Sequence, residues 1–477
     1  MKIQSFKKNN NEKTYVQNRN NPLLRMIYYL HRRWTNLPSA KVIPLGFIGI
    51  IIVGTFLLWL PCASRSAGSV PLSDCWFTAA SATCVTGLVR YDTQRTWTLF
   101  GQVVILTMIQ IGGVGFMAIV LSGLVAARRR IFLHTRRLMQ DSISVGQVGG
   151  IVRITEFVMK GTFLIEGIGA LLLSFYFIPR LGFGKGIWYS IFHSISAFCN
   201  AGFDLMGVWE PGSSLILVKT NWYMNIVYML LITIGGLGFL VWKDLLDNRF
   251  HFNRLRLHSK LVLVTSAVLT FGGAIAIFLL EIGSPEFEAL NLKGKILVSL
   301  FQSVTCRTAG FCTLDLGAMT SAAQAFMIFL MFIGSSSGST GGGMKTTTFV
   351  VHVLSIRAIA RRRKTIEAFH RSISEETVHT ASCIAALYIF SALLFALIIC
   401  SIEGNITFQE AFFETVSSVA TVGSTLGLTA KLSMVSKLLL TVLMIFGRSG
   451  TVTMLYALTR RDKKVQAKYP AESITIG

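Results

Sequence analysis

Four copies of one pattern run through the sequence, and this repeat limits the possible fold more than any other feature. Each copy has a long apolar stretch, a short half-apolar segment that ends in a glycine-containing turn, and a second apolar stretch. The near-equal spacing of the copies indicates internal repetition. The four turns are Thr83-Cys84-Val85-Thr86-Gly87, Phe198-Cys199-Asn200-Ala201-Gly202, Cys306-Arg307-Thr308-Ala309-Gly310 and Val419-Ala420-Thr421-Val422-Gly423.

The second apolar stretch of each copy carries a further glycine signature. The run Ile111–Phe116 closely matches Ile234–Phe239, and the corresponding places in the third and fourth copies are Ile333-Gly334 and Phe446-Gly447. Each copy is therefore predicted to fold as a helix, a short segment, a glycine turn and a second helix.

The composition places most of the chain in a membrane. Of the 477 residues, 52% are hydrophobic and only 14% are charged, whereas a soluble protein has about a quarter charged residues. A helix needs about 20 apolar residues to cross the hydrocarbon of a bilayer. We therefore expect an all-α integral membrane protein with eight transmembrane helices. The eight apolar stretches are 43–62, 98–126, 157–178, 221–242, 260–281, 322–355, 381–402 and 434–458.

The basic residues predict how the chain is oriented. Lys and Arg number 45 against 22 Asp and Glu, a net charge of +23, and most of them fall in five segments separated by pairs of expected spans. Because basic segments resist translocation, we expect both termini in the cytoplasm of a multi-pass protein of the plasma (inner) membrane. The polar N-terminus predicts no signal peptide, and no motif-bearing basic domain indicates a nucleic-acid partner. The basic segments are 1–41, 126–160, 243–260, 356–376 and 459–477.

The four short segments, each of about 12 residues, are too brief to cross, since this is roughly 18 Å of helix. Their length suits a half-helix that enters the membrane and returns as a loop, which is tolerated where it lines a cavity or is buried in protein. Four helix C-termini and four inward-facing glycine turns around one axis would favour a cation. This pattern predicts a selective cation pore, and glycine-rich packing turns of an unrelated transporter are the alternative. The segments are 72–83, 187–198, 294–305 and 408–419.

The sixth apolar stretch is interrupted by ten consecutive Gly, Ser and Thr residues at 334–343. Such a run does not hold a stable helix by propensity. It predicts a flexible loop that could block the pore and move aside, and a tight helix crossing is the alternative. The run also contains a G-x-S-x-G pattern around Ser336, but the serine-hydrolase motif requires a preceding strand, so a membrane-embedded hydrolase is a remote alternative. Met344 separates Lys345 from the last glycine, which excludes a Walker phosphate loop.

The rest of the sequence predicts neither an enzyme nor a bound cofactor. The eight cysteines form no CxxC pair or His/Cys cluster, so no disulfide framework or zinc site is expected. The glycine runs near Ile111 and Ile234 lie in apolar spans without a βαβ pattern, so they are not a nucleotide-binding fingerprint. A nucleotide, if one is used, must bind a partner.

Several of these motifs resemble those of the Trk/Ktr/HKT potassium transporter superfamily, over roughly residues 42–458. The filter loops of this superfamily are similar to Ser81–Leu88, Phe198–Phe203 and Arg307–Phe311. Other motifs of the superfamily are similar to Gly338–Lys345 and Phe446–Gly450. The likeness is greatest to the Ktr-type membrane subunit. Trk-type relatives usually carry an extra helix pair before the first unit, and the basic, polar residues 1–41 leave no room for that pair. The fourth turn departs most from its siblings in sequence.

The resemblance implies four helix–loop–helix units around a pseudo-fourfold K⁺ pore, with Na⁺ coupling in some members. It also implies a homodimer in membrane lipid, on a cytosolic ring of nucleotide-binding regulatory subunits of the KtrA or TrkA type. Relatives that prefer Na⁺ have serine in place of the first filter glycine, whereas this chain keeps glycine in all four turns. A Na⁺-preferring or Na⁺-coupled transporter of the same fold is the alternative. By the same resemblance, the K⁺-binding filter is formed by the four five-residue turns given above, and the gate by Gly338, Ser339, Thr340, Gly341, Gly342, Gly343, Lys345 and Arg448.

A few side chains carry their own expectations. Arg448 lies in an apolar span, where an unpaired charge costs at least a few kcal/mol, so Arg448 and Lys345 are expected to act as an electrostatic barrier or to contact loop carbonyls. Arg307 should point behind the filter, and Asn200 should brace its turn. Two acidic residues in or at the end of spans, Glu166 and Glu281, are candidates for a coupling-ion site, although packing roles are favoured for both and for His193.

The expected organisation is two cytoplasmic tails around four pore units, the third of which contains the gating loop 334–345. The segments are a basic N-terminal tail 1–41, units 42–127, 128–245, 246–356 and 357–458, and a C-terminal tail 459–477.

Overall fold

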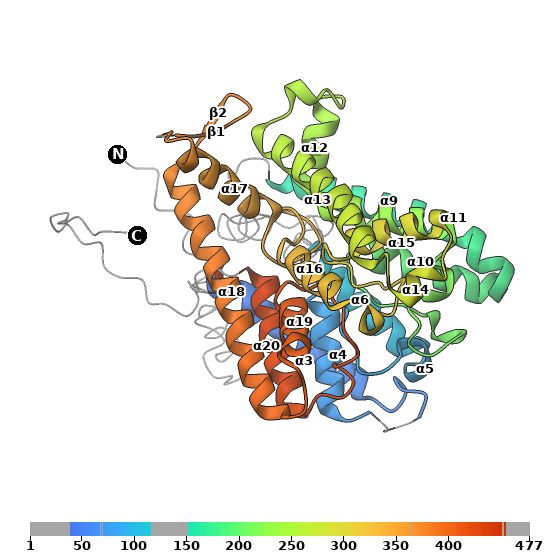
Figure 1. The fold of residues 1–477 in the computed structure, drawn as a ribbon. Helices are drawn as coiled ribbons and strands as arrows, with labels where there is room; N and C mark the ends of the chain where they lie inside the picture. Colours follow the sequence, from blue (N-terminus) through green and yellow to red (C-terminus); the bar gives the residue numbers. More distant parts are fainter. Residues whose placement is uncertain are drawn as a thin grey trace, which may run out of the picture.

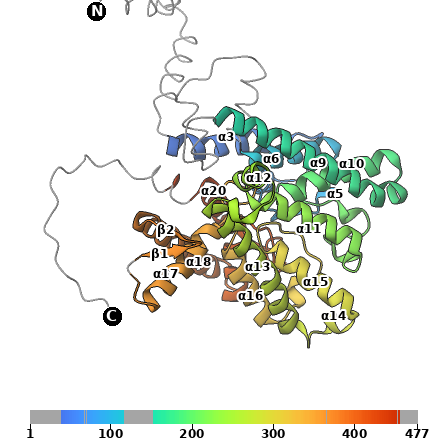
Figure 2. The same ribbon diagram turned by 90° about the horizontal axis from the view of Figure 1, so that it is seen from above.

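The helices of the chain form four similar sets that follow one another around a common centre (Figures 1 and 2). The computed structural model describes residues 39–115 except 67 and 69, residues 151–450 except 364, and residues 453–454. Seen from above, the sets run in sequence order from α3 and α6, through α9–α11 and α13–α16, to α18 and α20 (Figure 2). The predicted fourfold, all-α membrane architecture is confirmed. Residues 1–38 of the N-terminal tail, residues 116–150 and the C-terminal tail 459–477 lie outside the described residues.

Each set contains a long outer helix, a short helix that ends in a glycine turn, and a second helix. The outer helices are α3 (Ser39–Trp59), α9 (Ile151–Leu181), α13 (Leu257–Glu281) and α18 (Glu375–Glu403). The short helices are α4 (Leu72–Thr83), α10 (Phe183–Phe198), α15 (Leu292–Thr305) and α19 (Phe408–Val419). The second helices are α6 (Leu99–Val114), α11 (Trp222–Leu237), α16 (Ser321–Phe332) and α20 (Met434–Ser449).

The remaining elements connect these sets. Helix α17 continues the third set beyond a loop, and α12 continues the second; a small antiparallel hairpin, β1–β2, joins α17 to α18 at the same end of the molecule as α12 (Figure 1). Their bounds are α5 Thr93–Thr96, α12 Phe239–Asp247, α14 Pro285–Glu288, α17 Thr346–Ala360, β1 Ile366–Ala368, β2 Arg371–Ile373, and the 3₁₀ turns Met206–Val208, Ile216–Val218, Phe252–Arg254 and Leu316–Ala318.

The sets pack in a closed cycle. Within each set, the short helix packs on its own outer helix. The second helix of each set then packs against the short helix of the next set: α6 on α10, α11 on α15, α16 on α19, and α20 on α4. Every short helix is thus held from two sides, and the contact of the fourth set with the first closes the ring.

Each second helix begins at a polar N-cap residue, the kind of residue that is preferred at this position. The capping side chain accepts a hydrogen bond from the backbone N–H three residues later, which satisfies one of the free donors of the first turn. These caps are Thr98, Asn221, Thr320 and Ser433.

Only some of the expected spans are single long helices. Among the described residues, α3, α9, α13 and α18 are long and apolar enough to cross a membrane, and α11 with α12 forms a fifth candidate that is bent by 91°. Helices α6, α16 and α20 are shorter than the 20 or so residues that a straight crossing needs. The continuation of the expected spans 98–126 and 434–458 lies largely outside the described residues.

The expected continuous helix over residues 221–242 is wrong. Gly238 has φ 92°, which ends α11, and α12 leaves in a new direction. The same positive φ ends α6 at Gly115 and α20 at Gly450, so the break belongs to the repeated pattern. In the second set the backbone N–H of Phe239 then donates to the carbonyl of Gly338, in another set, at 2.8 Å instead of continuing the helical ladder. The interruption of the sixth span, by contrast, is confirmed, since α16 ends at Phe332 and α17 starts at Thr346.

The N-terminus of α19 provides a test of local stability. Thr407 and Glu410 form a capping box, in which the Glu410 carboxylate accepts the Thr407 N–H at 2.8 Å and the Thr407 side chain accepts the Glu410 N–H at 3.3 Å. Thr407→Ala should lower the free energy of unfolding by about 1 kcal/mol, measured as a lower Tm of the detergent-solubilised protein. Thr407→Ser keeps the hydroxyl and should retain the wild-type Tm; an equal loss in both variants would contradict the capping role.

Candidate functional site

The four glycine turns meet at the centre of the ring of helices. A Cβ added to Gly87 would lie 2.6 Å from the carbonyl oxygen of Ala201, the residue before the next turn's glycine. Since real Cβ atoms do not approach an oxygen this closely, no side chain fits between the turns. The same relation recurs around the circle: Gly202 with the carbonyl of Ala309 at 2.9 Å, Gly310 with that of Val422 at 2.5 Å, and Gly423 with that of Thr86.

The residue two positions before each glycine has a left-handed backbone. In three turns it ends the short helix in a Schellman arrangement, for example with Val85 N–H on the Ala82 carbonyl (3.2 Å) and Thr86 N–H on the Ser81 carbonyl (2.8 Å). This conformation costs a non-glycine residue about 1–2 kcal/mol. Backbone strain of this kind concentrates at functional sites. The four residues are Val85 (φ 56°), Asn200 (59°), Thr308 (76°) and Thr421 (51°).

The third turn differs from the other three in backbone geometry. The N–H of Ala309 donates to the Thr305 carbonyl, four residues back, at 2.9 Å, whereas its counterparts Thr86, Ala201 and Val422 each donate five residues back. The sequence marked the fourth turn as the most divergent, but the fourth has the same closing bonds as the first two.

Hydroxyl groups from the short helices brace all four turns. The N–H groups of Gly87 and Gly423 donate to the side chains of Ser81 (3.0 Å) and Ser417 (3.1 Å). In the other two turns the hydroxyl donates outward instead, from Ser196 to the Phe203 carbonyl at 2.6 Å and from Thr305 to the Phe311 carbonyl at 2.7 Å. The bracing role of these hydroxyls was not predicted from the sequence, although a Ser or Thr in the last turn of every short segment was the available signal.

Arg307 and Asn200 are directed into the protein behind the turns. The Arg307 guanidinium donates to the hydroxyls of Ser266 (2.9 Å) and Thr270 (3.2 Å) on α13, so its charge is held against the outer helix. The buried amide of Asn200 lies 3.5 Å from the Thr308 hydroxyl of the third turn. Asn200 therefore links two neighbouring turns through its side chain.

The other polar residues singled out from the sequence have structural partners. Glu281 caps α16 by accepting the N–H (2.9 Å) and hydroxyl (2.8 Å) of Thr320. Glu166 accepts from the Gln110 amide at 3.1 Å. The ring of His193 accepts the N–H of Leu205 at 2.8 Å and lies among aromatic rings. These contacts agree with packing roles for all three.

An inserted loop, residues 333–345 between α16 and α17, lies directly against the turns. The Thr340 hydroxyl donates to the Phe198 carbonyl at the end of α10 (3.0 Å). A Cβ on Gly341 would overlap the Thr308 hydroxyl, and one on Gly342 would lie 3.0 Å from a methyl carbon of Thr421. The small residues of this loop are thus required by its close approach to the second, third and fourth turns.

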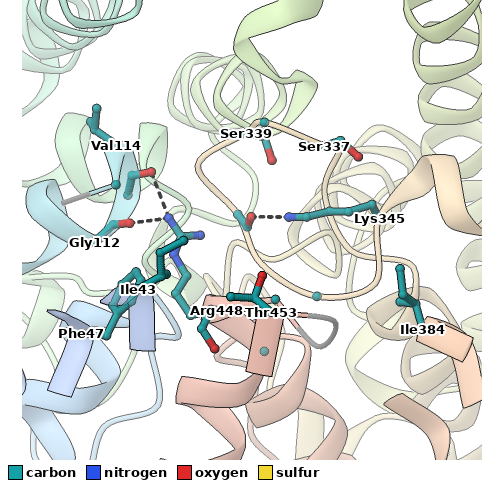
Figure 3. Close-up of a pocket in the computed structure, with 18 of the residues that line it drawn as sticks. Ile43, Phe47, Gly112, Val114, Ser337, Ser339, Lys345, Ile384, Arg448 and Thr453 are labelled. Carbon is teal, nitrogen blue, oxygen red and sulfur yellow. Dashed lines mark hydrogen bonds between the residues drawn. The ribbon is translucent and has the colours of Figure 1, made fainter. Parts of the chain in front are cut away.

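Arg448 ties the inserted loop to the first set (Figure 3). Its guanidinium donates to the carbonyl of Thr340 in the loop and to those of Gly112 and Gly113 at the end of α6, the last at 2.9 Å. One side chain therefore connects α20, α6 and the loop, and its partly buried charge is solvated by backbone carbonyls.

Lys345 secures the loop from its other end (Figure 3). Its ammonium donates to the carbonyls of Gly341 (2.8 Å) and Gly342 (3.2 Å). Both cations thus contact loop carbonyls, which was one of the two roles that the sequence suggested for them.

Two cavities lie on either side of this assembly. One, of about 230 Å³, is lined by all four turn glycines together with Asp92, Asp204 and Asp315. The other, of about 310 Å³, is lined by the inserted loop, Lys345, Arg448 and the ends of the second helices (Figure 3). The turns and the loop separate the two cavities, and the first offers carboxylates and carbonyl oxygens, the groups that cations prefer.

Sequence reasoning missed two buried carboxylates in the short helices. Asp74 on α4 is fully buried and pairs with Arg90 and with Lys437 of α20. Glu414 on α19 is also fully buried and accepts from the hydroxyls of Thr425 and Thr429, the latter at 2.9 Å. A charge inside an apolar segment was the signal that could have identified them.

The surroundings of Ser336 do not fit a hydrolase nucleophile. Its hydroxyl accepts from the Thr346 hydroxyl at 3.1 Å, and its N–H donates to the Gly236 carbonyl at 3.0 Å. In the described part of the chain the only strands are β1 and β2, both of which follow Ser336, whereas the nucleophile turn requires a strand before it.

Comparison with known proteins agrees with the fold. The family described as "TrkH: Cation transport protein" matches residues 46–469. The chain is 37% identical over 452 residues to "Potassium/sodium uptake protein NtpJ" of Enterococcus hirae, covering 92% of this chain and 98% of that protein. It is 36% identical over 450 residues to "Ktr system potassium uptake protein B" of Bacillus subtilis, covering 93% and 98%.

A solved structure supports the same fold. The potassium transporter TrkH from Vibrio parahaemolyticus superimposes with a TM-score of 0.67 at 19% identity, covering 89% of this chain and 86% of that one. Together with the family match over most of the length, this confirms the resemblance seen in the sequence, and the family consists of cation transporters, not enzymes. The chain belongs to the TrkH family of membrane cation transport proteins.

Proposed function

We propose that this chain takes up K⁺ through the centre of the four-turn ring. The observation that carries the proposal is the closed circle of turns, in which each glycine lies against the carbonyl of the next turn. Carbonyl oxygens arranged in this way can replace the hydration shell of a permeating cation. The filter would consist of residues 83–87, 198–202, 306–310 and 419–423. Support for K⁺ as the ion comes from the relative named "Ktr system potassium uptake protein B" and from glycine in all four turns.

The inserted loop would be the gate. It lies between the ring and the cavity beneath it. Arg448 holds it to α6, and Lys345 stabilises its internal conformation. Opening then requires the loop to leave carbonyl and hydroxyl partners in several sets. Since each hydrogen bond to a charged group contributes about 1.5–3 kcal/mol, Arg448 alone would bias the loop strongly toward the blocking position.

The proposed assembly follows the positive charges and the relatives. Both termini and the basic hairpin between α17 and α18 would lie in the cytoplasm. The four pore units, with the boundaries predicted from the sequence, would form a homodimer in lipid, and the cytoplasmic face would dock a nucleotide-binding regulatory ring. Support for such a ring is that relatives are named as components of a "Ktr system".

Na⁺ uptake or coupling is the second candidate. It is favoured by the relative named "Potassium/sodium uptake protein NtpJ", which is 37% identical to this chain. Fluxes of K⁺, Rb⁺ and Na⁺ into proteoliposomes that hold the purified protein separate the two candidates. Flux of K⁺ and Rb⁺ with little Na⁺ supports the first, and flux of Na⁺ alone would replace it by the second.

Substitution of one turn glycine should lower K⁺ flux. In Gly310→Ala the new methyl group would lie 2.5 Å from the Val422 carbonyl, so the ring must distort. We expect K⁺ flux to fall at least about tenfold, since a distortion that costs 1.4 kcal/mol in the conducting state already has this effect. Gly404→Ala is the matched control, because Gly404 also has positive φ (68°) but no atom within 4 Å of the added Cβ. Equal loss of flux in the two variants would contradict the filter.

Removal of the Arg448 side chain should open the pore. Arg448→Gln loses the charged link between the loop carbonyl of Thr340 and the end of α6, so basal K⁺ flux without a regulator should rise at least about tenfold. The measurement is K⁺ or Rb⁺ flux into proteoliposomes, with size-exclusion chromatography to verify folding. Reduced flux in a monodisperse variant would overturn the latch role.

Shortening the inserted loop tests the proposed gate independently of Arg448. Ile333 and Met344 form an isolated parallel bridge, so the two ends of the loop lie side by side and can be rejoined after a deletion. A deletion within residues 335–343 should give constitutive flux that keeps its preference for K⁺. Flux that remains absent in this variant would mean that the loop is not the barrier.

A further inference from the structure

A groove away from the proposed pore opens between α13, α17 and the β1–β2 hairpin. Its volume is about 420 Å³, which is within the range of small-ligand sites. One end is apolar, formed by Leu261 and Val264 of α13 and by Val350 and Leu354 of α17. The other end is basic, lined by Arg357, Arg361 and Arg363. This division into an apolar and a cationic end is that of a site for an amphiphile with a negative head.

The arginines at the basic end are not equivalent. Arg363 lies 3.9 Å from Glu367, the one carboxylate among the described residues that line the groove, and that carboxylate also accepts from the Thr365 hydroxyl at 3.0 Å. Arg357 and Arg361 are exposed, and their side chains make no ion pair or hydrogen bond with any described residue. The guanidinium groups of Arg357 and Arg361 therefore remain available for an external anion.

The hairpin wall of the groove is fixed in place. The ring of Phe369 at the hairpin tip packs edge-on against Phe252 at 6.0 Å, and the ammonium of Lys260 lies 5.8 Å from both rings. This contact ties the hairpin to the segment between α12 and α13, at the end of the molecule where the hairpin and α12 lie (Figure 1). The aromatic contact and the ammonium of Lys260 thus support the hairpin wall of the groove.

The apolar end continues onto outward-facing surfaces of both helices. On α13, Val268 and Phe271 are 63% and 62% exposed, and on α17, Ile356 is 67% exposed. In a membrane protein such side chains face acyl chains. Because the basic end is contiguous with these faces, a ligand can have its charge at the arginines and its hydrocarbon along the helices at the same time.

We propose that this groove binds one anionic phospholipid of the cytoplasmic leaflet, with its phosphate between Arg357 and Arg361 and its acyl chains along α13 and α17. Arginine forks match phosphate oxygens in a bidentate manner. Basic pockets between transmembrane helices on the cytoplasmic side are suited to anionic headgroups. A soluble phosphate would gain nothing from the apolar end, and an acidic protein surface would not reach the wall formed by Leu261 and Val350.

The test is native mass spectrometry of the full-length protein in detergent, titrated with dioleoylphosphatidylglycerol, dioleoylphosphatidylcholine or glycerol 3-phosphate. The wild-type protein should bind one phosphatidylglycerol in preference to phosphatidylcholine and retain no glycerol 3-phosphate. In R357Q/R361Q the Kd for phosphatidylglycerol should rise about 30-fold, from two lost charge contacts. V264W fills the groove without changing the charge and should weaken binding as well.

The matched control is R249Q/R254Q, which removes two exposed arginines from the neighbouring basic loop, outside the groove. Its Kd should equal that of the wild-type protein. Equal weakening in both double variants would show diffuse surface attraction and overturn the proposal. Comparable binding of glycerol 3-phosphate, equal binding of phosphatidylcholine, or unchanged binding in V264W would overturn it too.

Discussion

The contact between each turn glycine and the carbonyl of the next turn is the constraint on which the rest of the structure depends. Backbones can approach so closely only if no Cβ intervenes, and the four short helices must then end at matching distances from one centre. The residue two positions before each glycine has a left-handed backbone and turns the chain inward at this point. The hydroxyls of Ser81, Ser417, Ser196 and Thr305 hold the turns in this conformation. The cyclic packing of second helices on short helices supplies the surrounding support.

The inserted loop makes this fourfold arrangement unequal. Glycines at matching places in the other second helices, such as Gly112 and Gly447, lie against the carbonyls that end their own short helices, Thr83 and Val419. Gly334 lies instead against the returning loop, 2.7 Å from the Gly342 carbonyl when a Cβ is added. In the third set, therefore, the contact between this glycine and the end of the short helix is replaced by a contact with the inserted loop, which lies beneath the ring. The link through Arg448 depends on that loop, since the guanidinium donates to the carbonyl of Thr340.

Much of this fold could be predicted from the sequence, because the decisive signals are local. The expected segments 72–83 and 408–419 coincide with α4 and α19, since an apolar run and a glycine turn define both ends. Helix α10 starts earlier than the expected segment 187–198, at Phe183, because Gly182 with φ 78° allows the chain to enter it directly from α9. The gate residues could be named from the resemblance, although their contacts could not.

The contacts that could not be predicted join residues that are distant in the chain. Asp74 pairs with Lys437, 363 residues away, and the N–H of Phe239, just after α11, donates to a carbonyl in a loop of another set. The altered third turn carries no obvious local signal. A single sequence records residue types but not such pairings, so it identifies the ring more readily than the contacts that hold it.

The fusion of four sets into one chain has a consequence for symmetry. In an assembly of four identical subunits, every feature of one subunit would appear four times, and four copies of the inserted loop would compete for the same place beneath the ring. A single chain can instead diverge set by set, so that one copy supplies the loop while another supplies Arg448 to hold it. Duplication followed by divergence thus permits an off-axis element to act on an axial site.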